Sequence, residues 1–280
     1  RLVRALRARG QVIAMTGDGV NDAPALKQAD VGVAMGKGGT EAAKEASEMV
    51  LADDNFASIA AAMREGRTVY DNLKKAIVFL LPVNGGESFA IILALLLGLT
   101  LPITPLQILW VNMVSSVGLA MALAFEPPEP DVMRRPPRSA EEPILSGFLL
   151  WRVAFVSTLF FCGIFGIFWW TQAEGATLAE SRTYAVNTLV VMEIFYLFSV
   201  RRLRAPSLTL SGVRGTRPVL IALAVVVTLQ LIFTYAPFME AFFDTRPVDF
   251  VHGAEILGVG IALFAILEIE KRVIGLFDRR

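Results

Sequence analysis

The sequence predicts an α-helical membrane protein with six transmembrane helices, preceded by part of an α/β domain. Six apolar stretches are each long enough, at roughly 20 residues, to cross a bilayer. Hydrophobic residues make up 55% of the 280 residues, and mean hydropathy is +0.58, both too high for most soluble proteins. Residues 12–15 form a short apolar run ending in Gly-Asp-Gly, which is typical of a buried parallel strand that stops at a tight turn.

The turn after residues 12–15 carries the first candidate site. Gly17 and Gly19 let the backbone turn sharply and approach a ligand closely. Asp18 then projects from the carboxyl end of the strand, where open α/β sheets place their ligands. The pattern is not a Walker loop, because no Gly-Lys-Ser/Thr follows, and it is not the dinucleotide-binding G-x-G-x-x-G.

Further oxygen ligands follow Asp18. Asn21 and Asp22 come at a spacing that lets them return to the same point. Two carboxylates and an amide around one spot are hard oxygen ligands, which suit magnesium better than zinc. The alternative is an ordinary Asp-Gly turn capped by Asn21 and Asp22.

A polar, helix-prone segment connects this region to the first apolar span. Residues 49–51 are predicted to form another strand, after which we expect Asp53 and Asp54 to cap the next helix. Residues 55–70 then run into the span without a strong break. They form either a stalk that transmits movement or a plain amphipathic linker helix.

The spans themselves are placed by their apolar length. We expect them at about residues 74–98, 104–125, 147–170, 184–201, 218–237 and 253–271.

Basic residues in the loops predict the orientation of the chain. By the positive-inside rule, the side that carries most of them is cytoplasmic, as are both ends of the chain. The opposite loops carry only Arg182 and Arg246. The basic residues on the cytoplasmic side are Lys74, Lys75, Arg134, Arg135, Arg138, Arg201, Arg202, Arg204, Arg214, Arg217, Lys271, Arg272, Arg279 and Arg280.

Polar residues interrupt the first span, where they are costly and so usually have a role. Pro82 cannot donate to the carbonyl four residues earlier, and Gly85 and Gly86 loosen the helix further. We expect the freed carbonyls and opened backbone to line a polar cavity, as in the cation sites of transporters. Asn84 and Glu87 are three residues apart and therefore share one helical face.

The second and fourth spans repeat this pattern. In the second, Asn112, Ser115 and Ser116 are spaced by three and four residues. In the fourth, Glu193 stands alone among apolar neighbours. The alternative for Glu193 is a hydrogen bond between helices with no role in transport.

Four segments of the sequence resemble the P-type cation-transporting ATPases, in the branch of the calcium pumps and the sodium/potassium pump and of prokaryotic type. The most specific is Met-Thr-Gly-Asp-Gly-Val-Asn-Asp-Ala-Pro-Ala-Leu at residues 15–26. The others are Ala-Asp-Val-Gly-Val-Ala-Met-Gly at 29–36, Trp-Val-Asn at 110–112 and Arg-Pro-Pro-Arg at 135–138. The resemblance runs from about residue 10 to the end of the chain.

This resemblance implies a domain order and an activity. Residues 1–56 correspond to the C-terminal part of a cytoplasmic haloacid dehalogenase-like phosphorylation domain, 57–73 to a stalk helix, and 74–280 to a six-helix cation-transport domain. The implied protein is a plasma-membrane pump that uses ATP as substrate, magnesium as cofactor and an aspartyl-phosphate intermediate.

The resemblance also implies roles for particular residues. Asp18 would hold magnesium, with Thr16, Gly17, Asn21 and Asp22 beside it at the catalytic site. The positions that would coordinate the transported cation are Asn84, Glu87, Asn112, Ser115, Ser116 and Glu193.

Ser116 is where the sequence departs from the family. Calcium and sodium/potassium pumps carry an aspartate at this position, and this chain offers only a hydroxyl. Calcium prefers six to eight oxygens, usually with several carboxylates. The transported ion therefore stays open between calcium and a monovalent ion such as sodium, potassium or a proton.

One motif that ATP hydrolysis in this family requires is missing from the sequence. The family's nucleophile lies in an Asp-Lys-Thr-Gly-Thr motif, which does not occur here. We expect a carboxyl-terminal fragment that needs the missing N-terminal portion and is inactive alone. The alternative is a non-catalytic membrane scaffold or passive pore with a remnant phosphatase-like domain. The formal net charge is zero, so no basic face indicates a nucleic-acid partner, and the expected surroundings are the lipid bilayer.

Overall fold

The structure is a computed structural model that describes residues 1–139, 143–144, 146–202 and 215–277. It divides into two compact units, which are treated separately below. The first comprises Arg1–Thr68 and Pro128–Glu142, and the second Val69–Pro127 and Pro143–Arg280. Four of the basic residues used above to predict orientation, Arg204, Arg214, Arg279 and Arg280, lie outside the described residues.

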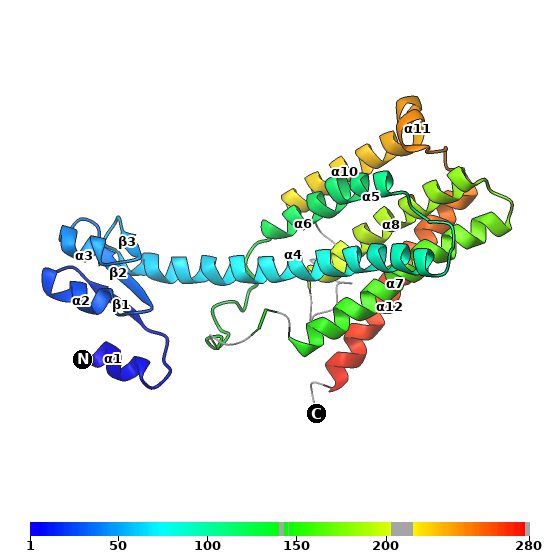
Figure 1. The fold of residues 1–280 in the computed structure, drawn as a ribbon. Helices are drawn as coiled ribbons and strands as arrows, with labels where there is room; N and C mark the ends of the chain where they lie inside the picture. The colour runs from blue at the N-terminus through cyan, green and yellow to red at the C-terminus, as the bar shows by residue number, and fades with distance from the viewer. Residues whose placement is uncertain (140–142, 145, 203–214, 278–280) are drawn as a thin grey trace. The chain divides into compact units, whose positions relative to one another are not determined.

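A parallel sheet of three strands forms the centre of the first unit (Figure 1). The strands lie in the order β1-β2-β3, and their small core consists of Leu26, Ala34 and Ala43, with Met15 packed against it. This sheet confirms the predicted α/β part. The elements are α1 (Leu2–Arg7), β1 (Ala14–Gly17), the 3-10 helix η1 (Val20–Asp22), α2 (Ala23–Leu26), β2 (Val31–Met35), α3 (Glu41–Glu45) and β3 (Met49–Leu51).

The junction after β3 corrects one expectation. Asp54 does not cap the next helix. It has a left-handed backbone (φ 54°), and its carboxylate accepts the backbone N–H groups of residues 36–38 at 2.6, 2.9 and 2.7 Å. These donors, that of Lys37 first, lower the pKa of Asp54. The start of the helix is capped instead by Asn55, whose side-chain oxygen accepts the N–H of Ala57 at 2.9 Å.

Among the residues that the structure describes, six helices are long and apolar enough to span a membrane, which confirms the predicted helical membrane protein. They fall in the second unit, except that α4 begins in the first. The first is α4 (Phe56–Leu96), and the second is made of α5 (Pro105–Val111), the π-helix η2 (Asn112–Ser116) and α6 (Val117–Ala124). The other four are α7 (Gly147–Ala173), α8 (Leu178–Val200), α10 (Arg217–Tyr235) and α12 (Phe250–Phe277), and a short helix, α11 (Pro237–Phe243), lies between the last two.

The observed helices are longer than the predicted spans at several ends. Helix α4 is continuous from Phe56 through residue 70 and through Pro82, so the linker and the first span are one helix. Helix α8 begins at Leu178, six residues before the predicted 184, because Thr177 and Glu180 form a reciprocal capping box there. Polar capping residues thus extend the helix beyond its apolar stretch.

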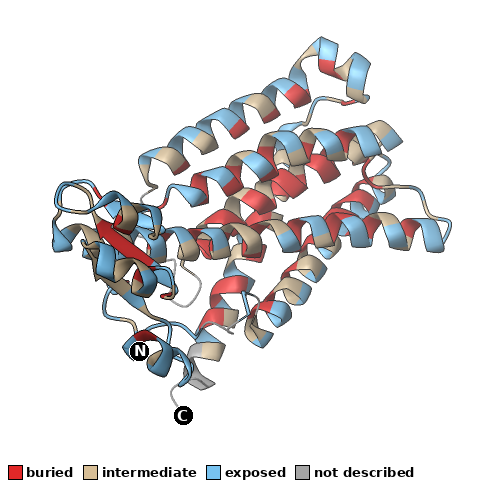
Figure 2. Ribbon diagram, turned by 60° about the vertical axis from the view of Figure 1, so that its left-hand side comes forward, coloured by how far each residue is buried: buried red, intermediate tan, exposed pale blue. Residues whose placement is uncertain are grey.

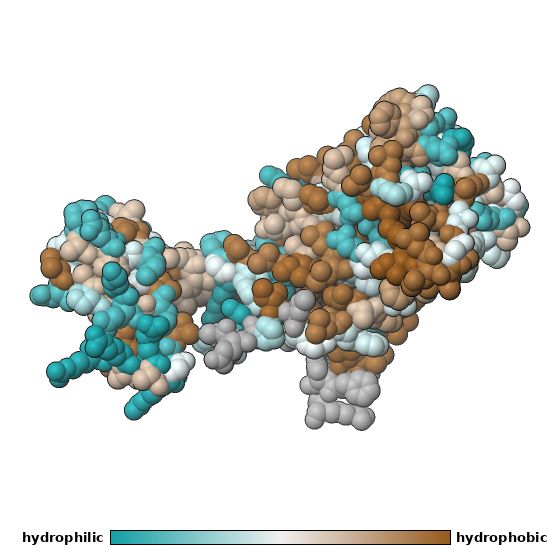
Figure 3. Space-filling model, in the orientation of Figure 1, coloured by the Kyte–Doolittle hydropathy of each residue, from teal (hydrophilic) through white to brown (hydrophobic). Residues whose placement is uncertain are grey.

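Helix α8 lies at the centre of the second unit. In its most apolar window 72% of the residues are buried, against 22% for α12, and it packs against both α7 and α12. Buried positions follow these inner helix faces in Figure 2. The outer faces carry exposed apolar side chains, which appear as broad brown areas on the second unit in Figure 3. An apolar surface of this kind is what lipid contact requires.

Helices α4 and α7 approach each other closely at Gly86. A Cβ at this position would lie 2.4 Å from the Cβ of Phe160 and 3.2 Å from the carbonyl oxygen of Ser157. We expect Gly86→Ala to destabilise the protein by about 1–3 kcal/mol, because the helices must separate to admit the methyl group. Thermal unfolding of the purified full-length protein measures this loss.

Gly66 in the same helix provides the matched control. Nothing lies within 4 Å of a Cβ built there. Gly66→Ala should therefore be neutral or stabilising by up to about 1 kcal/mol, through helix propensity alone. Equal effects of the two substitutions would contradict close packing at Gly86.

Candidate functional site

The first site lies where β1 ends. Asp18 follows Gly17 at the carboxyl end of the strand and is exposed. Asp22 does not point outward beside it. Its Oδ2 accepts the backbone N–H groups of Asp18 at 3.3 Å and Gly19 at 3.1 Å. Asp22 therefore fixes the loop that presents Asp18, a role that sequence spacing alone did not separate from ligand binding.

Two further residues shape this loop. A Cβ at Gly17 would lie 2.6 Å from the Cβ of Asp22, so the close return of η1 requires glycine there. Thr40, which the sequence analysis missed, donates its N–H (2.8 Å) and its hydroxyl (3.2 Å) to the carbonyl oxygen of Asp18. Its signal in the sequence is the Thr-Glu start of a helix, since Thr40 also caps α3.

The oxygens at this edge of the sheet fit a magnesium ion. Among the described residues, no side chain hydrogen-bonds to the carboxylate of Asp18, which leaves both oxygens available to a ligand. Asn21 is exposed and Thr16 is half-buried at the end of β1. These are hard oxygen donors, and no sulfur or imidazole accompanies them in the loop. Of the two predicted carboxylate ligands, Asp22 is thus bound to the loop backbone, and Asp18 is free of side-chain hydrogen bonds within the described residues.

The second site brings together two buried glutamates from different helices. Glu87 of α4 is 4% exposed, and its Oε2 accepts the side-chain amide of Asn112 at 3.0 Å. Glu193 of α8 is fully buried, and its Oε1 accepts the hydroxyl of Ser116 at 2.6 Å. The two carboxylates are close enough to interact electrostatically. Hydrogen bonds thus join four of the six predicted cation-site residues in two neighbouring pairs from three spans.

Each glutamate keeps one oxygen without a partner. Glu87 Oε1 and Glu193 Oε2 are buried and accept no hydrogen bond from the described residues. A buried carboxylate oxygen left unpaired is costly, more so in a membrane helix. A bound cation or proton offsets that cost, so the cluster has the chemistry of a cation site.

The π-helix η2 supplies the facing polar groups. It spans Asn112–Ser116 and contributes both of the side chains that donate to the two glutamates. A π segment inserts one extra residue per turn, and such bulges often occur at functional sites. From this segment, Asn112 donates to Glu87 of α4 and Ser116 donates to Glu193 of α8. Apolar patterning gives no signal for it.

The two other predicted residues differ in position. The Ser115 hydroxyl is buried next to Glu193 and donates to the carbonyl oxygen of Val111 at 3.0 Å. Asn84 is exposed on α4, and no hydrogen bond of its side chain is found in the described part of the chain. The structure therefore does not bring Asn84 to the two glutamates.

Pro82 has a different consequence from the one expected. It frees the carbonyl of Val78, but α4 stays helical through this point. The hydroxyl of Tyr196 in α8 donates to it at 2.7 Å. A second carbonyl, that of Pro82 itself, accepts the hydroxyl of Ser157 at 3.2 Å. The expectation of an opened backbone at this point was wrong. The helix is continuous, and hydroxyl groups from α7 and α8 donate hydrogen bonds to these two carbonyl oxygens.

This arrangement predicts a coupling between Tyr196 and Pro82. Tyr196→Phe should cost about 1 kcal/mol, because it keeps the ring and leaves the Val78 carbonyl unpaired. In a Pro82→Ala background the alanine N–H can bond that carbonyl within the helix, so the loss should shrink toward zero. A double-mutant cycle, in which stability is followed by thermal unfolding, measures the coupling free energy between Tyr196 and Pro82. Tyr235→Phe, which removes an unrelated hydroxyl bond to Val248, should cost the same in both backgrounds.

Charged side chains inside the predicted spans form a further network that sequence reasoning missed. Arg152 of α7 is fully buried and donates to Glu270 at 2.9 Å and to the hydroxyl of Ser199 at 3.1 Å. Lys271 donates to Glu268 and to the carbonyl of Ser199, at 2.9 and 2.8 Å. Charges within apolar stretches were the available signal. Here they pair with one another and join α7, α8 and α12.

Comparison with known proteins finds a family for each part of the chain. A family model described as cation transporting ATPase, C-terminus, matches residues 100–273, and one described as haloacid dehalogenase-like hydrolase matches residues 1–63. The chain is 50% identical over 278 residues to the cation-transporting ATPase pma1 of Synechocystis, covering 98% of this chain and 31% of that protein.

Two other relatives extend the range of similarity. The probable cation-transporting ATPase F of Mycobacterium tuberculosis is 49% identical over 266 residues, 95% of this chain and 28% of that protein. The calcium-transporting ATPase 1 of Bacillus cereus is 37% identical over 286 residues, 97% and 32% respectively. The chain thus spans less than a third of each relative. With a C-terminal family model that covers most of the six apolar helices and a hydrolase model over the parallel sheet, this chain belongs to the P-type cation-transporting ATPases.

Proposed function

We propose that the chain is the carboxyl-terminal part of an ATP-driven cation pump of the plasma membrane, with both ends of the chain cytoplasmic. The observation that carries this proposal is the buried cluster of Glu87 and Glu193, which accept hydrogen bonds from Asn112 and Ser116 and each keep one oxygen without a partner in the described part of the chain. Acidic side chains buried within membrane-spanning helices are costly and usually mark ion pathways.

The first unit would supply part of the phosphorylation site. Asp18 would hold magnesium, which neutralises phosphate charge when it is bound. Asp22 and Thr40 keep the loop in place, so that the Asp18 carboxylate stays at the carboxyl end of β1. The nucleophile and the nucleotide-binding domain would come from the remainder of the full-length protein, so the chain alone would not hydrolyse ATP.

The cation cluster limits the charge that can be bound. Two carboxylates can neutralise one divalent ion, or one monovalent ion together with a proton. Ser116 donates to Glu193 where relatives with an aspartate would add a third acid. We propose that this serine sets the selectivity of the site between calcium and sodium, potassium or protons.

The test is ATPase activity of the full-length protein in lipid, titrated separately with calcium, sodium, potassium and manganese. Ser116→Asp is compared with the native protein, and Ser116→Asn is the uncharged control of similar size. A calcium response gained only with Asp supports selectivity by Ser116. A native calcium response means that the aspartate is dispensable. No response to any of these cations would favour the alternative, a membrane scaffold or passive pore.

A further inference from the structure

A group of metal-ligating side chains lies away from both sites, where α12 begins. Glu174 follows the end of α7, and His252 and Glu255 lie in the first turns of α12. One ligand atom from each lies within 4.8 Å of the others. Solvent can reach the group, since the side chains of Glu174 and His252 are 45% and 19% exposed.

The imidazole of His252 is held in one orientation. Asp249 caps α12, and its Oδ1 accepts the N–H groups of Val251 and His252 at 2.8 and 3.0 Å. Its Oδ2 lies 2.5 Å from Nδ1 of His252. The ring also stacks on Tyr184, with centroids 4.5 Å apart and planes inclined by 14°. An Nδ1–H bound by a fixed carboxylate leaves the lone pair of Nε2 for a metal.

The separation between Nε2 and Glu174 fits two ligands of one ion. Glu174 Oε2 lies 3.5 Å from Nε2 of His252. That is longer than an N–H···O hydrogen bond, whose usual range is about 2.7–3.2 Å. Two ligands about 2.1 Å from a tetrahedral zinc ion lie roughly 3.4 Å apart. A lone pair facing a carboxylate oxygen is repulsive unless a positive charge lies between them.

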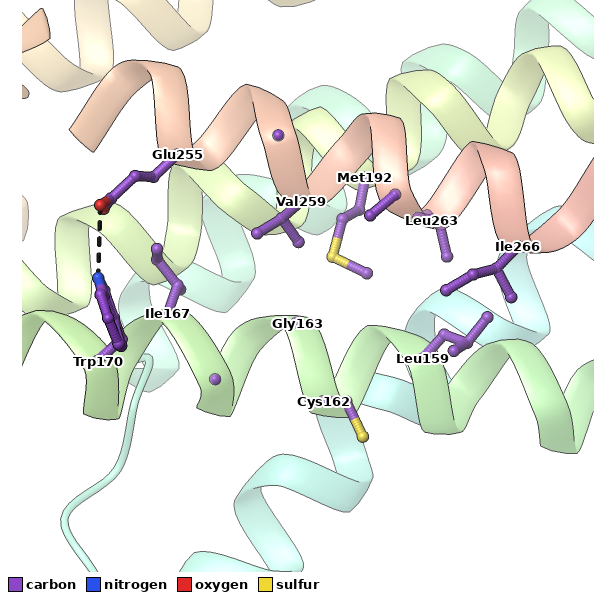
Figure 4. A pocket seen from close by; sticks show the side chains of 13 residues that line it. Leu159, Cys162, Gly163, Ile167, Trp170, Met192, Glu255, Val259, Leu263 and Ile266 are labelled. Atoms are coloured by element: carbon purple, nitrogen blue, oxygen red, sulfur yellow. Dashed lines mark hydrogen bonds between the residues drawn. The ribbon is translucent and has the colours of Figure 1, made fainter. Parts of the chain in front are cut away.

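Glu255 completes the group from the adjacent turn of α12. Its Oε1 accepts the indole N–H of Trp170 at 3.4 Å, as Figure 4 shows. Its Oε2 is buried and has no hydrogen-bond partner among the described residues. The carboxylate lies at one end of an apolar pocket between α7 and α12, whose other lining includes Leu159, Met192 and Ile266. Within 4.8 Å, the ligand atoms of Glu174 and His252 are polar neighbours of this carboxylate, which an ion could link to it.

We propose that Glu174, His252 and Glu255 bind one zinc-class divalent ion, with Asp249 orienting the imidazole. One nitrogen and two carboxylates suit zinc, whereas calcium and magnesium prefer sites made of oxygen alone. Three protein ligands leave one position open to water. The ion would offset the charges of the three surrounding acids. The competing arrangement is an imidazolium that bridges Asp249 and Glu174 without metal.

Zinc binding to the purified full-length protein tests the proposal. Equilibrium dialysis with zinc, in excess magnesium and calcium, is performed on a Glu87→Gln, Glu193→Gln background so that the other acidic cluster contributes nothing. We expect one zinc per chain. His252→Gln and Glu255→Gln should each weaken binding by at least about 100-fold, and Asp249→Asn by about 10-fold. Glu240→Gln, an acid in α11 outside the group, should change nothing.

Two results would overturn the proposal. One is zinc binding that is absent, or unchanged in the His252→Gln and Glu255→Gln variants, which would support the bridging imidazolium. The other is a zinc X-ray absorption spectrum without a histidine nitrogen near 2.0–2.1 Å, the distance expected for such a ligand. The spectrum is recorded on the protein with His252 and Glu255 intact, so it decides the matter even where a variant fails to fold.

Discussion

ATP turnover by the full-length protein is expected to fall by at least about 100-fold when Asp18 is replaced by asparagine. The substitution keeps the size of the side chain and removes the charge that would hold magnesium. The loop should keep its shape, because Asp22 binds the backbone N–H of residue 18 and not its side chain. Membrane insertion and thermal stability should therefore stay unchanged. Steady-state ATPase activity and labelling by radioactive ATP measure the effect.

Asp30 offers a control on the same sheet. It precedes β2, and because β1 and β2 are parallel it lies at the edge opposite to Asp18. Its carboxylate accepts the N–H of Ile13 at 2.9 Å and pairs with Arg7 at 3.3 Å. Asp30→Asn should cost some stability and leave the turnover of the folded protein intact. Normal turnover in Asp18→Asn would refute the magnesium role, and equal losses in both variants would show a general effect on the domain.

Those features of the fold that depend on a single local property of the sequence were predicted correctly. The length of the apolar stretches predicted each of the six helices that, within the described residues, are long enough to span a membrane, and the Gly-Asp-Gly turn placed Asp18 at the end of a strand. Helix ends were less predictable, because they depend on caps such as Thr177 with Glu180. These caps are polar and lie outside the apolar stretch that defines a span.

The site was predictable in its residue types and less so in its contacts. The acids were found because charge in an apolar span is rare. The effect of Pro82 was not, since it depends on Tyr196, which lies 118 residues from the carbonyl it bonds. Nor was the role of Asp22, because spacing allows it to face a ligand or the backbone of its own loop. Long-range partners decide these cases, and a single sequence does not reveal them.

Cation-stimulated ATPase activity should be lost, or its apparent cation affinity reduced by at least about 100-fold, when Glu193 is replaced by glutamine. A cation site needs the charge, whereas the hydrogen bond from Ser116 needs only an acceptor oxygen, which glutamine retains. The variant should also be as stable as the native protein or more stable without cation, because a buried carboxylate with an unpaired oxygen is costly. Cation titrations and thermal unfolding measure the two effects.

Glu270 tests the same substitution on a paired carboxylate. It is bonded to the fully buried Arg152 at 2.9 Å. Glu270→Gln leaves that guanidinium uncompensated, so we expect a loss of at least about 1 kcal/mol of stability with no change in apparent cation affinity. If Glu193 only joins helices through a hydrogen bond, Glu193→Gln should keep both affinity and stability. Opposite responses of the two glutamates, affinity lost at one and stability lost at the other, would separate an ion ligand from a structural pair.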